Sequence, residues 1–71
     1  MESKISYKPL KITLVLKDKT TADLKADLGI APATVAKLNK NEYVALTVIH
    51  KICDYLDCTI QEVVEFVREE S

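Results

Sequence analysis

Apolar side chains recur at three- and four-residue spacing along much of this chain, which is the spacing of one face of an α-helix. The longest such stripe predicts a helix from about residue 46 to residue 56. Its members are Leu46, Ile49, Ile52, Cys53 and Leu56. The pattern therefore indicates a helical protein whose strongest helix lies in the second half of the chain.

Residues 20–39 predict two short helices joined by a tight turn. Each helix has two apolar residues about one turn apart, and these are Leu24, Leu28, Val35 and Leu38. Thr20 is a good N-cap for the first helix, with Asp23 in its first turn. Gly29, the only glycine, lies in the turn, which Ile30 is expected to anchor in the core, and Pro32 suits the first turn of the second helix. This order is that of a helix-turn-helix, whose second helix can enter the major groove of DNA.

Residues 1–7 read as an extended arm that either pairs as an edge strand with a second copy or lies on the helices, and we expect the latter. Pro9 suits the first turn of a helix over residues 8–18. Leu10 and Leu14 form its buried seam, which Val15 is expected to widen. Ile12 and Leu16 lie off the seam. They form either a wider buried face or an exposed apolar patch that could bind a partner, and we expect the buried face.

The last predicted helix covers about residues 60–67. Thr59 and Glu62 have the spacing of a capping box that would open it. Its apolar stripe would consist of Ile60, Val63, Val64 and Val67. Phe66 lies off this stripe and is therefore a candidate for a contact between subunits.

Composition agrees with one small helical domain. The 71 residues are 48% hydrophobic and 30% charged, with one glycine and two prolines, which favours a folded chain with few turns. We therefore predict an all-α, compact five-helix bundle that spans residues 1–71 as a single domain. The N-terminus lacks an apolar leader core and no apolar run approaches the roughly 20 residues of a membrane span, so we expect a soluble, cytoplasmic protein.

The charges are unevenly divided although the net charge is −1. Residues 1–40 carry eight lysines against four acidic residues, a balance of +4, and residues 41–71 carry a balance of −5. This asymmetry suggests a first half that faces phosphate and a second half with another role. The alternative is that a small helical domain simply has unevenly charged faces.

Catalytic and metal-binding chemistry is sparse. His50, Cys53 and Cys58 are the only soft ligands, whereas a structural zinc site normally has four at paired spacing. No nucleophile and base are arranged as a catalytic set. We therefore expect no enzyme activity, no metal and no cofactor, and two reduced thiols.

The order of motifs resembles the small Cro/lambda-repressor-type helix-turn-helix regulators, also called the xenobiotic-response-element family. The resemblance is carried by ISYKPL, by DLKADLGIAPATVAKL and by LTVIHKICDYLDCTIQEVVEFV. It implies a lambda-repressor-like DNA-binding domain that acts as a homodimer on a two-fold related operator. The chain departs from the family pattern at Ala31, where a turn serine is usual, at Asn39, where an acid is usual, and at Asn41, where glycine is usual. Asn41 can still adopt the left-handed conformation.

In such a domain the outer face of the second helix of the unit would read base edges. The candidates are Pro32, Ala33, Thr34, Lys37 and Asn39. Phosphates would be contacted by the helix N-termini and the loop after the second helix, through Thr20, Thr21, Lys25, Lys40, Asn41 and Tyr43. For Ala33, Thr34 and Lys37 the plainer interpretation is a solvated surface residue, and for Tyr43 it is an ordinary half-buried tyrosine whose ring packs.

We therefore expect a sequence-specific DNA-binding transcriptional regulator, a repressor that binds a double-stranded operator as a homodimer. Tyr55, Phe66 and Val67 are the candidate dimer contacts. The alternative is a protein-interaction module on a helix-turn-helix fold that has lost DNA binding, which the net charge and the missing turn serine leave open.

Overall fold

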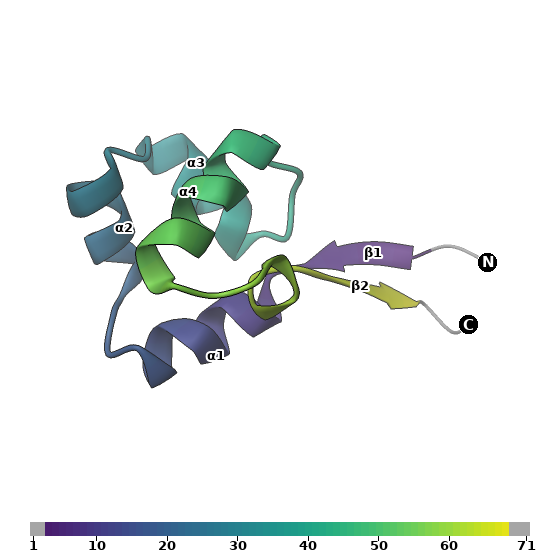
Figure 1. Cartoon of the computed structure of the whole chain (residues 1–71). Coiled ribbons are helices and arrows are strands. Elements are labelled where there is room, and N and C mark those ends of the chain that lie inside the picture. The colour runs from purple at the N-terminus through teal and green to yellow at the C-terminus, as the bar shows by residue number, and fades with distance from the viewer. Residues whose placement is uncertain (1–2, 69–71) are drawn as a thin grey trace.

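The computed structural model describes residues 3–68 and, within them, four α-helices and a two-stranded antiparallel sheet. In chain order the elements are β1 (Ser3–Ser6), α1 (Lys8–Leu16), α2 (Thr21–Leu28), α3 (Pro32–Asn39), α4 (Leu46–Leu56), the 3-10 helix η1 (Ile60–Glu62) and β2 (Glu65–Arg68). The helices gather at one end of the molecule, and the β1–β2 ribbon projects from the other end (Figure 1). No helix in this described part is long and apolar enough to cross a membrane.

One core joins all four helices. It is built from residues that recur at helical spacing, together with Tyr7, Ile30 and Val63 from the connecting segments. The buried hydrophobic side chains are Tyr7, Leu10, Leu14, Leu24, Ile30, Val35, Leu38, Ile49, Ile52, Leu56 and Val63. The bounds predicted for α3 and α4 are confirmed, and Ile30 is buried in the turn as expected.

The predicted fifth helix is wrong, and with it the all-α, five-helix description. Thr59 and Glu62 do form the expected capping box, but only the single turn of η1 follows it. The carbonyl groups that would continue a helix have other donors. The Thr13 hydroxyl donates to the carbonyl of Glu62 at 2.6 Å, and the Leu10 N–H, near the start of α1, donates to that of Val63 at 3.1 Å.

The N-terminal arm pairs within its own chain rather than lying on the helices. Ser3 is opposite Arg68, Lys4 opposite Val67, Ile5 opposite Phe66 and Ser6 opposite Glu65. The expectation that the arm lies on the helices is therefore wrong. The β-branched and aromatic residues of β2 suit a strand, and β1 supplies the backbone partner that a sequence read locally does not reveal.

The inner face of α1 differs from the prediction. Val15 is 78% exposed, and Ile12 and Leu16 are also exposed, so the wider buried face is wrong. The polar residue Thr13 is buried instead, because Glu62 provides an acceptor for its hydroxyl. The helix also ends at Leu16, two residues earlier than expected. At the start of α4, Leu46 is exposed although it continues the apolar stripe.

Candidate nucleic-acid interface

The interface begins with α2, which is firmly capped. The Thr20 N–H donates to the Asp23 carboxylate at 2.8 Å, and the Asp23 N–H donates to the Thr20 hydroxyl oxygen at 3.3 Å. This reciprocal capping box stabilises the N-terminus of α2. The predicted N-cap at Thr20 is confirmed, and the return bond to the Asp23 carboxylate is additional. Because the Thr20 side chain is bonded to Asp23, the backbone N–H groups of the first turn are the donors that this end of α2 can offer to an anion.

Gly29 sets the angle at which α3 leaves α2. Its φ of 67° and ψ of 27° are left-handed, and its N–H donates to the carbonyl of Lys25 at 3.0 Å. Ile30 then enters the core, and α3 starts at Pro32. Ala31 caps α3 with no side-chain hydrogen bond. Its carbonyl nevertheless accepts the first helical bonds, from Thr34 and Val35 at 2.9 and 3.1 Å.

The two faces of α3 have different environments. Val35 and Leu38 are buried against the other helices. The opposite face is accessible, since four of the five candidate base-reading residues are exposed and the fifth, Thr34, is half-buried: Pro32, Ala33, Thr34, Lys37 and Asn39. The helix is thus held firmly by one side and presents short side chains and one lysine on the other.

The loop after α3 is fixed by hydrogen bonds. Asn41 has a left-handed φ of 56°, so the loop keeps the conformation for which glycine is usual. The Tyr7 N–H donates to the Asn41 side-chain oxygen at 3.0 Å, and the Tyr7 hydroxyl donates to the carbonyl of Glu42 at 2.7 Å. Burial raises the pKa of Tyr7, so it stays protonated as a donor. Sequence reasoning assigned Asn41 to phosphate but did not reveal this structural role.

The other candidate phosphate contacts differ in exposure. Thr21 is half-buried, whereas Lys25, Lys40 and Asn41 are exposed. Tyr43 is 77% exposed, so its ring does not pack in the core. Its hydroxyl is therefore presented to solvent beside the end of α3, where it can donate to an anion.

The three candidate dimer residues do not lie together. Tyr55 on α4 donates a hydrogen bond to the Asp27 carboxylate of α2, and Lys19 Nζ is 5.3 Å from the centroid of its ring. The hydrogen bond to Asp27 raises the pKa of Tyr55, and the hydrogen bond to Tyr55 raises that of Lys19. Phe66 instead lies on the projecting ribbon, with Val67 beside it.

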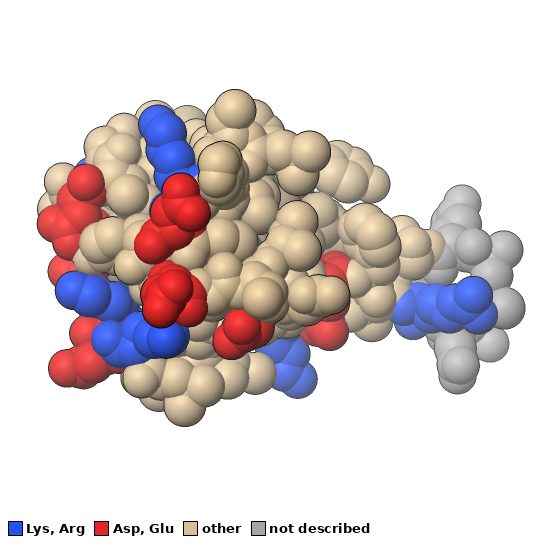
Figure 2. Space-filling model, in the orientation of Figure 1, with Lys and Arg blue, Asp and Glu red and all other residues tan. Residues whose placement is uncertain are grey.

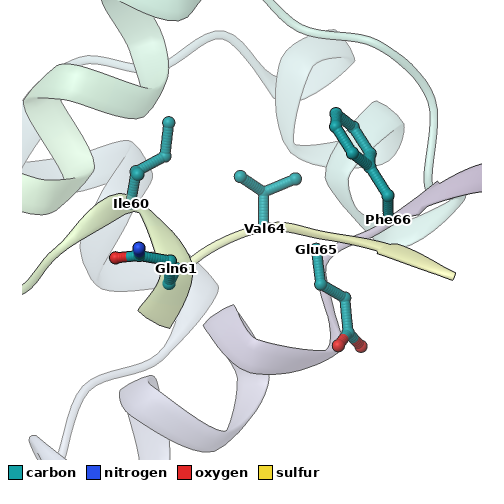
Figure 3. A pocket seen from close by; sticks show the side chains of 5 residues that line it. All are labelled: Ile60, Gln61, Val64, Glu65 and Phe66. Carbon is teal, nitrogen blue, oxygen red and sulfur yellow. The ribbon is translucent and has the colours of Figure 1, made fainter.

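Phe66 borders an apolar pocket of about 490 Å³ lined by Ile60, Gln61, Val64, Glu65 and Phe66. Figure 3 shows the side chains of Ile60, Val64 and Phe66 on the same side of the backbone, with the Glu65 carboxylate pointing away. In Figure 2 most charged side chains lie over the helical end of the molecule, at left, and the surface from there towards the ribbon consists mostly of other residues.

The thiols and the histidine form no evident reactive site. Cys53 and Cys58 are both free and half-buried, and burial raises the pKa of Cys58 to about 11. His50 forms a surface pair with Asp54 at 3.4 Å, both side chains being mostly exposed. Among the residues that the structure describes, no cluster of three or more metal-ligating side chains occurs.

The α2–α3 pair with its turn at Gly29, the buried inner face of α3 and its exposed outer face define a helix-turn-helix domain. Residues 9–69 match the family described as the Cro/C1-type HTH DNA-binding domain, and the chain belongs to that family. A solved structure described as the transcriptional regulator VanUg, form II, is also similar, at 36% sequence identity and a TM-score of 0.90. The match covers 97% of this chain and 92% of that one. A comparison with curated proteins found no match.

Proposed function

We propose that this protein is a sequence-specific transcriptional repressor that inserts α3 into the major groove of its operator. The observation that carries the proposal is the exposed outer face of α3 on a Cro/C1-type helix-turn-helix. The similarity to a transcriptional regulator over almost the whole chain supports the same role. The narrower relationship to the xenobiotic-response-element group is part of this proposal.

Three residues on α3 carry the proposed sequence reading. Ala33 is exposed and offers a methyl group to a thymine methyl. Thr34 can donate to or accept from a base edge, and the ammonium of Lys37 can donate to guanine O6 and N7. Pro32 and Asn39 flank them at the two ends of the helix. A bidentate contact such as that proposed for Lys37 contributes about 1–3 kcal/mol of discrimination when well formed.

Phosphate contacts position α3 without reading sequence. In this proposal they come from the N-terminal turn of α2, through Thr20 and Thr21, and from Lys25, Lys40, Asn41 and Tyr43. The loop residues are well suited to this role because hydrogen bonds from Tyr7 hold the loop in one conformation. A preformed contact surface loses less entropy on binding than a mobile one.

The operator is proposed to be bound by a homodimer that associates mainly through Phe66. Val67 follows it on β2 and points to the other face of the ribbon, where Lys4 is opposite it, so Val67 contributes only at the edge of the contact. Phe66 is 76% exposed beside the apolar pocket with Ile60 and Val64, an arrangement that a second copy can cover. Tyr55 contributes less in this proposal, because its hydroxyl already bonds to Asp27. Two copies related by a two-fold axis would engage half-sites about 34–36 Å apart.

The test is selection of binding sequences from randomised duplexes, followed by affinity measurements on the selected site. We expect one palindromic sequence to be enriched and Lys37→Ala to weaken binding to it more than binding to a mixed-sequence duplex. The matched control is Lys17→Ala, at the end of α1 away from α3. Added to a template that carries the selected site upstream of a start site, the protein should lower transcription.

The competing function is that of a protein-interaction module on the same fold. Salt distinguishes the two functions. For a DNA binder that neutralises Z phosphates, the logarithm of the binding constant falls with the logarithm of the salt concentration with a slope of about −0.9Z. A module that has lost DNA binding shows no such DNA affinity to lose. If no sequence is enriched and Lys37→Ala changes nothing, the regulator proposal is wrong and the interaction module takes its place.

A further inference from the structure

A second concave surface lies between β1 and the end of α3. It has a volume of about 500 Å³ and is lined by Lys4, Ile5, Lys37, Asn41, Glu42 and Tyr43. Lys4 comes from the N-terminal strand and Lys37 from the proposed reading face of α3, so two cations far apart in sequence border one concavity. Tyr43 adds an exposed hydroxyl donor to its rim.

The strand is held firmly relative to α3. Directly after β1, the buried side chain of Tyr7 donates to the carbonyl of Glu42, and its N–H donates to Asn41. The Glu42 N–H in turn donates to the carbonyl of Lys37 at 2.9 Å. A short chain of hydrogen bonds therefore connects the end of β1 to the last turn of α3.

Pairing with β2 fixes the strand itself. Lys4 is opposite Val67 in the antiparallel register, with a paired residue on each side of it. Its backbone position is thus set by the sheet, unlike that of a lysine on a loose terminal arm. Lys4 also interacts within the protein. Because an ammonium group has three N–H donors, a lysine can keep one contact and still donate to a phosphate.

The charge around the concavity favours an anion by a narrow margin. Lys4 and Lys37 supply two positive charges and Glu42 one negative charge. β1 lies beside the end of α3. When α3 occupies the major groove, β1 therefore borders the phosphate backbone that flanks the groove. The anion that this surface would meet is therefore a DNA phosphate.

We propose that Lys4 of β1 contacts a phosphate of the DNA backbone that flanks the groove entered by α3. The β ribbon then extends the DNA-binding surface beyond the helix-turn-helix, and the Glu42 carboxylate weakens this contact by repulsion. The inference rests on the proposed function, because it requires α3 to be in the groove. It adds to the proposed contacts of α3 a sequence-independent contact from the N-terminal strand.

The experiment measures binding of the full chain to a mixed-sequence duplex and to the selected site by fluorescence anisotropy over a range of salt. We expect Lys4→Ala to reduce the magnitude of the log–log salt slope by about 0.9 for each bound protomer on both duplexes, and therefore by about 1.8 for the proposed homodimer, because each protomer loses one phosphate contact without regard to sequence. Lys4→Arg should keep the slope, and Lys17→Ala should resemble the wild type.

A complementary variant tests the repulsion. Glu42→Gln removes a carboxylate from the concavity and keeps the backbone groups that bond to Tyr7 and Lys37. It should tighten binding to both duplexes, whereas unchanged or weaker binding would argue against a phosphate there.

The two proposals fail in distinguishable ways. If Lys4→Ala leaves slope and affinity unchanged while Lys37→Ala weakens binding to the selected site, β1 does not contact DNA and the regulator proposal stands. If the wild type shows no salt-dependent DNA binding, the proposed function itself fails. Circular dichroism and thermal unfolding of Lys4→Ala should match the wild type, since the residue is exposed on the strand.

Discussion

At the scale of single residues, the angle between α2 and α3 depends on the backbone of Gly29. Its φ is 67°, and nothing lies within 4 Å of where a Cβ atom would be. The methyl group of an alanine therefore meets no neighbour at its Cβ position, and the cost of alanine is backbone strain alone.

We predict that Gly29→Ala lowers the free energy of unfolding by about 1 kcal/mol, because alanine is disfavoured in the left-handed region. Gly29→Asn should cost less, since asparagine tolerates that conformation, as Asn41 does at a φ of 56°. Urea denaturation of the three proteins checks the order. Equal stability of the alanine and asparagine variants would contradict the explanation by backbone strain.

At the scale of elements, the C-terminal segment is shaped by its attachment to α1. The hydroxyl of Thr13 and the N–H of Leu10 use the carbonyl groups of Glu62 and Val63, and the chain then leaves as β2. The buried Val63 side chain completes the attachment. Hydrogen bonds between distant segments therefore decide whether residues 60–68 form a helix or a strand.

We predict that Thr13→Val lowers the free energy of unfolding by about 1 kcal/mol, because the carbonyl of Glu62 loses its donor while the buried volume is nearly unchanged. Amide exchange in residues 63–67 should become faster as the segment is released. Thr13→Ser keeps the hydroxyl and serves as the control for hydrogen bonding. Unchanged exchange in Thr13→Val would show that the hydroxyl does not hold the segment.

These cases explain which parts of the fold could be predicted. Features governed by nearby residues were accessible, such as the N-cap at Thr20, the turn at Gly29 and the apolar stripe of α4. Val15 and residues 65–67 were assigned wrongly, and the burial of Thr13 was not predicted, because these environments depend on partners far away in sequence. A run rich in valine and phenylalanine was the available signal for β2.

The candidate site follows the same rule. The exposed face of α3 could be predicted because burial of Val35 and Leu38 determines which side chains point outwards. The position of Lys4 beside Lys37 could not, because it depends on the pairing of β1 with β2 and on the bonds made by Tyr7.

At the scale of the whole molecule, two exposed apolar surfaces compete as the place where a second copy would bind. One lies on α1 and includes Ile12 and Leu16, and the other surrounds Phe66 on the ribbon. The ribbon surface has the stronger case, because Phe66 borders an apolar pocket, and a two-stranded sheet is only marginally stable by itself. Covering it with a second copy would stabilise the ribbon as well as the dimer.

We therefore predict that Phe66→Ser converts a dimer into a monomer in sedimentation experiments and that Leu16→Ser does not. The two residues are a matched pair, since each is 76% exposed in the single chain, so neither change should disturb the core. The monomeric variant should also bind a palindromic site more weakly than the wild type, because the two half-sites are no longer engaged together. Dissociation by Leu16→Ser alone would move the interface to α1, and a wild type that sediments as a monomer at high concentration would remove the dimer from the proposed function.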